Sequence, residues 1–151
     1  MMTLNNWLEQ HFLIDHEPSR EEISDLLAVV ARDLEDASVE RLSADRRLGI
    51  AYNAVRNLAC LALAAEGYRP GRQRSHEWAI QSLRLTIKLE QEKVDTLDAV
   101  RRMRHTSDYL RAGTASSREV EEVYRLATDL EERVLAWMRG AHPDLLDQES
   151  S

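Results

Sequence analysis

The apolar residues of the chain recur at three- and four-residue spacings, and this period predicts helices along most of its length. The first long helix is predicted to start after Pro18. Ser19 is placed to cap it, and Glu22, three residues on, would complete a capping box. One apolar stripe follows on this helix, formed by Ile23, Leu27, Val30 and Leu34.

A second helix is predicted from Ser43 to the region of Gly67, with Pro70 just beyond. Between Ala54 and Ala65 this segment is apolar nearly all round. A helix of that kind normally has neighbours on several sides, so we expect it at the centre of the fold.

The stretch "YRPGRQR" that follows is predicted to be a loop because of its proline and glycine. Ser75 is placed to cap a shorter helix that carries Trp78 and Leu83. After the polar segment "EQEK", a further helix is predicted, whose inward residues are Val94, Leu97 and Val100.

The last helix has the clearest pattern of the chain. Ser116 and Glu119 form a predicted capping box, and Gly140 is the predicted end. Between them, apolar residues recur at three-and-four spacing, namely Val120, Val123, Ala127, Leu130, Val134 and Trp137.

No segment shows the alternating pattern of a strand, and no internal repeat of fixed period is found. The pattern therefore predicts an all-α, up-and-down bundle of four main helices, with an extra N-terminal helical segment from about Leu4. We expect one domain over residues 1–140 and a frayed C-terminal tail over 141–151.

The composition of the chain restricts its expected binding partners and its expected cellular compartment. A net charge of −7 argues against a general electrostatic grip on nucleic acid, so any such contact must be local. The single cysteine, Cys60, excludes an intramolecular disulfide and fits a reducing compartment. The first residues lack a secretory signal, and no apolar run approaches the roughly 18 residues of a membrane span, so a cytoplasmic protein is expected.

Several kinds of site have no support in the sequence. Paired Glu-x-x-His motifs, a second thiol, a glycine-rich phosphate loop and a G-x-S-x-G motif are all missing. The triplet Asp15 to Glu17 has metal-binding residue types, but its place before Pro18 favours a loop. Neither a metal nor a cofactor is expected.

The stretch "RRMRHTSDYL", residues 101–110, is the main candidate for chemistry. On a helix, Arg101, His105 and Tyr109 form one line, and Arg104 and Asp108 form the adjacent line. One interpretation is a solvated strip in which Arg104 and Asp108 pair weakly.

The other interpretation is a phosphate site, since arginine suits phosphate oxygens and histidine exchanges protons near neutral pH. Arg56, which interrupts an apolar helix, needs a polar partner if it is buried, and Asp108 is the candidate. A structural ion pair and a catalytic pair both remain open there.

Three pieces in order resemble the HEPN family: "AYNAVRNLACLALAAEGYRP", "LDAVRRMRHTSDY" and the amphipathic last helix, over about Ser43 to Trp137. The resemblance implies a small four-helix module that is usually dimeric and occurs in toxin–antitoxin and defence systems. Active members of the family are metal-independent endoribonucleases.

Their motif is an arginine, a polar residue, and a histidine after four to six intervening positions. Arg104 and His105 match its first two residues, and those intervals lead to Tyr109, Leu110 and Arg111. Tyr109 therefore stands in place of the histidine. With a reference pKa of about 10, tyrosine is a poor general base at pH 7.

Two readings of this departure stay open. His105, one turn from Tyr109, would act as the proton-transfer group instead, or the chain resembles a branch that binds nucleotide or RNA, or pairs with a partner, without cleaving. As a hypothesis from the cluster of Arg104, His105 and Tyr109, two protomers would pack their Arg104 helices across a two-fold axis, and His105 and Tyr109 would supply hydrogen bonds or protons. Arg101 and Arg102 would add positive potential. His76, beside the basic loop, would either reach the same cleft or be an exposed residue at the start of its helix.

The expected function is therefore that of a HEPN-like dimeric RNA- or nucleotide-binding protein with residual or lost endoribonuclease activity. A nucleotidyltransferase-type protein is an expected partner in a toxin–antitoxin setting. The alternative is a non-enzymatic helical interaction module, such as an antitoxin, an adaptor or a structural dimer, in which the last helix serves as the partner surface. A helical bundle unrelated to the family is the third possibility.

Overall fold

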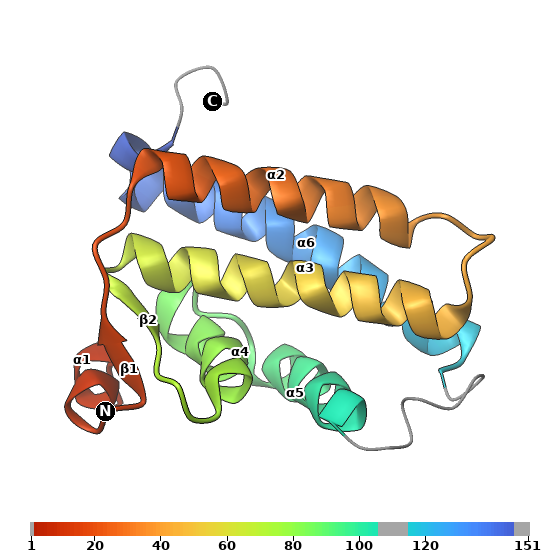
Figure 1. Cartoon of the computed structure of the whole chain (residues 1–151), viewed down its shortest axis with the longest axis horizontal. Coiled ribbons are helices and arrows are strands. Elements are labelled where there is room, and N and C mark those ends of the chain that lie inside the picture. Colours follow the sequence, from red (N-terminus) through yellow and green to blue (C-terminus); the bar gives the residue numbers. More distant parts are fainter. Residues whose placement is uncertain (1, 106–114, 147–151) are drawn as a thin grey trace.

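A computed structural model describes residues 2–105 and 115–146 of the chain (Figure 1). The described residues are mostly helical, as predicted. The elements in chain order are α1 (Leu4–Glu9), β1 (Leu13–Asp15), α2 (Arg20–Ala37), α3 (Ala44–Ala65), β2 (Tyr68–Pro70), α4 (Ser75–Thr86), α5 (Gln91–His105), α6 (Ser117–Ala141) and the 3₁₀ turn η2 (Pro143–Leu145).

Helix α3 lies at the centre of the fold, as its all-round apolar pattern predicted. Helix α2 runs along one side of it, α4 and α5 follow one another along the opposite side, and α6 lies behind (Figure 1). Residues such as Ala51, Val55, Leu58 and Ala62 have no exposed surface. The core is therefore built around α3.

Among the described helices, α3 alone is long and apolar enough to meet the composition test for a membrane span. Of its most apolar window, 67% is buried inside the fold. A core helix of a soluble protein passes the same test, so this is weak evidence for a membrane.

Three serines begin helices where the sequence placed them. The hydroxyls of Ser19 and Ser43 accept from the backbone N–H of Glu22 and Arg46, at 3.1 and 3.3 Å. Ser116 and Glu119 form the full capping box at the start of α6. The box predicted for Ser19 is only half formed, because both carboxylate oxygens of Glu22 lie 2.8 Å from Nε2 of His16.

Two predicted helix ends differ from the structure. Helix α4 is preceded by Arg74 in the left-handed region (φ 57°), so Ser75 is its first residue and makes no cap. Helix α6 continues through Gly140 to Ala141. Glycine is tolerated inside a helix when packing on its other faces holds the helix.

The expected tail is in part ordered. Residues 143–145 form η2, Leu146 is 6% exposed, and its carbonyl accepts from Nη2 of Arg20 at 3.0 Å. Residues 147–151 of that segment lie outside the described residues.

Two short strands were not predicted. β1 and β2 pair antiparallel with Leu13 opposite Pro70, so part of the basic "YRPGRQR" segment is a strand rather than a loop. Beneath them, Trp7, Leu13 and Leu63 form a small second core. The strand pair thus fixes the N-terminal segment to the end of α3.

Candidate functional site

Arg104, which the sequence matched to the arginine of the HEPN motif, lies near the end of α5 and reaches back onto α3. Its Nη1 donates to the carbonyl oxygen of Gly49 at 2.8 Å, and its guanidinium carbon lies 5.1 Å from the centre of the Tyr52 ring. A Cβ at position 49 would lie 3.4 Å from that nitrogen, which is an ordinary van der Waals contact. Arg104 therefore joins two helices and is only partly exposed.

Arg101 and Arg102 share one carboxylate on their own helix. Nε of Arg101 donates to Asp98 at 2.8 Å, and the two side chains are 14% and 13% exposed. Arg102 lies 3.5 Å from the other oxygen of Asp98 and is 66% exposed. Two guanidinium groups against one carboxylate leave this part of α5 positive.

Arg56 links three helices through polar side chains. Its Nη2 donates to Oδ1 of Asn53 at 2.7 Å, and its Nη1 lies 3.1 Å from Nε2 of His76 on α4. Asn53 in turn donates to the buried carboxylate of Asp33 on α2 at 3.1 Å. Since arginine only donates, Nε2 of His76 acts as the acceptor and the ring is neutral in this contact.

Tyr52 lies among these groups and is 4% exposed. Its hydroxyl has no hydrogen-bond partner among the described residues. Burial raises the pKa of the phenol, while the charges of Arg56, Arg101 and Arg104 oppose that rise. The hydroxyl is thus a protonated donor in the electrostatic field of three guanidinium groups.

The start of α4 borders the same region. Nη2 of Arg74 donates to Glu77 at 2.6 Å, and the guanidinium lies 5.3 Å from the centre of the Trp78 ring. This hydrogen bond is the main cause of the lowered pKa of Glu77, and Arg101 lowers it further. Helices α4 and α5 pack against each other, which brings the charge of Arg101 to act on Glu77.

The structure thus brings Arg56, Arg101 and Arg104 together around Tyr52, with His76 beside Arg56. His105 is the last residue of α5, and its side chain is outside the described residues, as are Asp108 and Tyr109. The predicted line through Arg101, His105 and Tyr109, and the pairing of Arg56 or Arg104 with Asp108, therefore stay predictions.

Sequence reasoning overlooked Tyr52, Asn53, Asp98 and Glu77. A signal for the first two was present, because Tyr52 and Asn53 lie four and three residues before Arg56 and share its helix face. Asp98 likewise lies three residues before Arg101. Glu77 lies three residues after Arg74, its hydrogen-bond partner, so a signal of the same kind was present there too.

The arrangement has the chemistry of an anion site. Around Tyr52 lie Arg56, Arg101 and Arg104, and Asp98 is the carboxylate that acts on the phenol. Guanidinium groups donate in a planar geometry that matches phosphate oxygens, and the phenol adds a neutral donor. In a chain of net charge −7, this concentration of positive charge is local.

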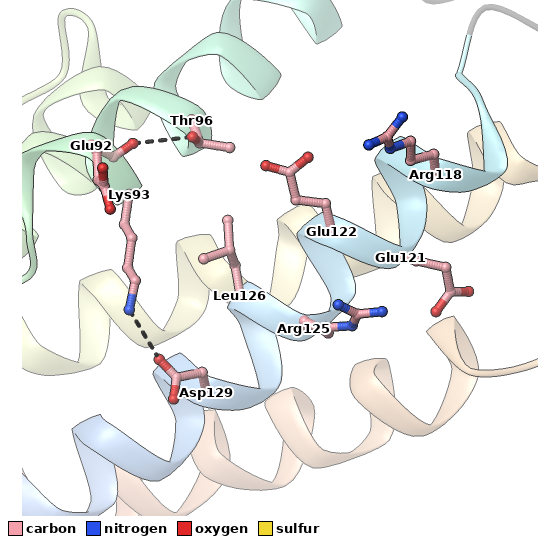
Figure 2. Close-up of a pocket in the computed structure, with 9 residues that line it drawn as sticks. All are labelled: Glu92, Lys93, Thr96, Arg118, Glu121, Glu122, Arg125, Leu126 and Asp129. Atoms are coloured by element: carbon pink, nitrogen blue, oxygen red, sulfur yellow. Dashed lines mark hydrogen bonds and ion pairs between the residues drawn. The ribbon is translucent and has the colours of Figure 1, made fainter.

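A groove of about 880 Å³ runs between α5 and α6 on another part of the surface (Figure 2). Glu92, Lys93 and Thr96 line it from α5, and charged residues of α6 line the other wall. A smaller hollow of about 250 Å³ shares Thr96 and Glu122 with it and is lined by apolar residues, including Leu48, Val100, Met103 and Val123.

No family model, no curated protein and no solved structure matches the chain. The resemblance to the HEPN family accordingly depends on the motif residues and on their order along the chain.

Proposed function

We propose that this is a HEPN-like protein that binds the phosphate groups of RNA or of a nucleotide at the cluster of Tyr52, Arg56, Arg101 and Arg104. The observation that carries the proposal is the Tyr52 hydroxyl, which is buried without a partner among the described residues. Its ring lies under Arg104, and the charges of Arg56 and Arg101 also act on the phenol. A buried polar group without a partner is costly, and a phosphate oxygen would satisfy it.

Binding without cleavage is the better supported form of this proposal. The position of the motif histidine is occupied by Tyr109, and the raised pKa of Tyr52 keeps this second phenol protonated. Neither phenol is then a general base at neutral pH. His76, whose Nε2 accepts from Arg56 at 3.1 Å, positions the guanidinium.

The setting expected from the family resemblance belongs to the same proposal. It comprises a cytoplasmic homodimer of a toxin–antitoxin or defence system, with a nucleotidyltransferase-type protein as partner. The net acidity of the chain and the local character of the arginine cluster are consistent with binding of a short nucleic-acid segment.

The test is a titration of the full chain with single-stranded and structured RNA and with a nucleoside triphosphate, in the presence of a chelator. Arg104→Ala should weaken binding by about tenfold or more, because a hydrogen bond to a charged group is worth about 1.5–3 kcal/mol. Arg139→Ala, an exposed arginine near the end of α6, is the matched control.

Equal binding by the wild type and by Arg104→Ala would rule out this site. The same samples resolved on a gel would report any cleavage. Cleavage in chelator that is lost in His105→Ala would instead identify a metal-independent endoribonuclease that uses His105.

A second candidate function is a helical interaction module, and the groove between α5 and α6 favours it. An apolar floor with charged walls suits the recognition of an amphipathic helix. A chain that binds no RNA or nucleotide and yet forms a complex of defined stoichiometry, lost on substitution within the groove, would support this function.

A further inference from the structure

The outer face of α6 carries four charged residues that lie in one line along the groove, Arg118, Glu122, Arg125 and Asp129 (Figure 2). Their spacings of four, three and four residues place them on the same side of the helix. All four are exposed. Within the described residues, Arg118, Glu122 and Arg125 form no ion pair, and Asp129 lies 3.7 Å from Lys93, near the limit of such a contact.

The order of these charges is self-complementary about the midpoint between Val123 and Tyr124. Glu122 and Arg125 are the second residues to either side of it, and Arg118 and Asp129 are the sixth. In each pair, one residue is acidic and the other basic. If a second α6 lay antiparallel beside the first with this midpoint on a two-fold axis, every charge of the line would face its opposite.

A two-fold interface has this property by necessity, because residue i contacts residue j and residue j contacts residue i. Glu122 would face Arg125 of the second copy, and Arg118 would face its Asp129. Symmetry repeats each pair, so the interface would hold two copies of both. By contrast, like charges would meet if the two copies were displaced along the helix by three or four residues. This repulsion in the displaced arrangements fixes the register of the two helices.

The groove supplies the space and the apolar contact for such a neighbour. Leu126 lies on its α6 wall and is only partly buried. Val100, Met103 and Val123 line the adjoining hollow. Because α5 packs mainly on α4 rather than on α6, the space between α5 and α6 is open to a further helix (Figure 1).

We infer that the occupant of the groove between α5 and α6 is α6 of a second copy of this chain, in an antiparallel two-fold dimer with Glu122 opposite Arg125 and Arg118 opposite Asp129. This inference depends on the homodimer expected in the proposed function and not on its phosphate-binding part. It also replaces contact between two α5 helices, the arrangement suggested by the motif alone, with contact between two α6 helices.

The test is a charge reversal followed by a charge exchange, with self-association measured by sedimentation over a range of protein concentrations. Arg125→Glu places two carboxylates against each other at both symmetric positions, so the dimer should dissociate about tenfold more readily. The double variant Glu122→Arg with Arg125→Glu restores opposite charges in a homodimer. It should associate like the wild type.

Arg139→Glu, on the same helix beyond the charged line, is the control and should leave association unchanged. Thermal melting of each variant reports any loss of folding. If Arg125→Glu failed to fold, the outer contacts would be tested in the same way. The single variant Arg118→Glu would reverse one charge, and the double variant Arg118→Glu with Asp129→Arg would exchange the two. Higher salt should also weaken the wild-type dimer, because exposed ion pairs are screened.

A monomeric wild type, or a charge exchange that associates as weakly as the single reversal, would overturn the inference. It would likewise be overturned if Arg102→Glu on α5 dissociated the dimer while Arg125→Glu did not. RNA titration of the same variants separates the two proposals. If no dimer forms, the cluster around Tyr52 is unchanged and RNA binding is still tested. If RNA does not bind, the sedimentation result still tests the dimer.

Discussion

The guanidinium of Arg104 lies over the ring of Tyr52, with its central carbon 5.1 Å from the ring centre. A cation at this distance from an aromatic face is attracted by the ring, and the attraction grows where water is excluded. The same arginine donates to Gly49, so the end of α5 is attached to α3 by both a hydrogen bond and a ring contact. The position of Arg104 therefore depends on Tyr52, and the two residues should be tested together.

Tyr52→Phe keeps the ring under Arg104 and removes a hydroxyl that has no partner among the described residues. We expect the free energy of unfolding in urea to stay the same or to rise by up to about 1 kcal/mol, because an unsatisfied buried group is removed. RNA or nucleotide binding should weaken by about tenfold. A large loss of stability would show that the hydroxyl is hydrogen-bonded in the folded protein.

Arg56→Met should lower the free energy of unfolding by about 1–3 kcal/mol, because Asn53 and His76 each lose a charged donor inside the fold. Urea denaturation measures the change. Arg32→Met, an arginine that is 66% exposed on α2, should change stability by no more than about 0.5 kcal/mol. Equal effects of the two substitutions would argue against a structural role for the contacts of Arg56.

Ser116→Ala removes the cap of α6 and should cost about 1 kcal/mol. The neighbouring Ser117→Ala is a matched control, because Ser117 is the first helical residue and is not the cap. Each variant loses one serine hydroxyl, and the two positions are neighbours. A difference between their denaturation midpoints therefore measures the capping box. Equal midpoints would mean that packing alone sets the start of α6.

Glu90 and Arg133 give a prediction for pH. Nη1 of Arg133 lies 2.7 Å from Glu90, and this hydrogen bond is the main cause that lowers the pKa of the carboxyl to about 2 from 4.5. A carboxyl whose pKa is lowered by folding stabilises the folded state at pH values above its pKa in the unfolded chain. That stabilisation is lost as the pH falls from 4.5 toward 2. The group is exposed, so its effect on overall stability should be small.

The direct measurement is an NMR titration of the Glu90 carboxyl carbon. In Arg133→Gln the pKa should return toward its ordinary value, and in Arg139→Gln it should not change. A wild-type Glu90 that titrates near its ordinary value would show that the contact with Arg133 is not maintained in solution.

Two glycines provide opposite predictions for the same substitution. A Cβ at Gly71 would lie 2.9 Å from the carbonyl oxygen of His11 and 3.1 Å from that of Phe12, so Gly71→Ala should destabilise by about 1–3 kcal/mol. A Cβ at Gly140 would meet no atom within 4 Å, and the residue is inside α6. Gly140→Ala should therefore stabilise by about 0.5–1 kcal/mol, as measured by thermal and chemical denaturation.

The elements that depend on local chemistry were predictable from the sequence. Ser19, Ser43 and Ser116 begin α2, α3 and α6 because each hydroxyl satisfies a backbone N–H within three residues. The central position of α3 was predictable because, between Ala54 and Ala65, apolar residues cover nearly the whole helix circumference. All of these signals are contained within one segment.

The features that sequence reasoning missed depend on partners distant in the sequence. β2 has three residues and pairs with β1, which precedes two long helices. The same limit applies to the site. The preference of arginine for a polar partner was evident for Arg56, but the partner His76 could not be chosen until α4 was placed against α3. The charge symmetry of α6 was present in the sequence, and its meaning appears only when the groove beside it is known.

The pairing of β1 with β2 also bears on how the fold forms. One backbone hydrogen bond lies at each end of the strand pair. The N–H of His16 donates to the carbonyl oxygen of Gly67 at 2.9 Å, and the N–H of Gly71 donates to the carbonyl oxygen of Phe12 at 2.8 Å. These contacts close a chain segment that contains the whole of α2 and α3, and closing a long segment costs entropy that is recovered only when the enclosed helices are packed. We therefore expect these two amides to exchange with solvent deuterium together with the α2–α3 pair, so that their protection reports the integrity of half the protein.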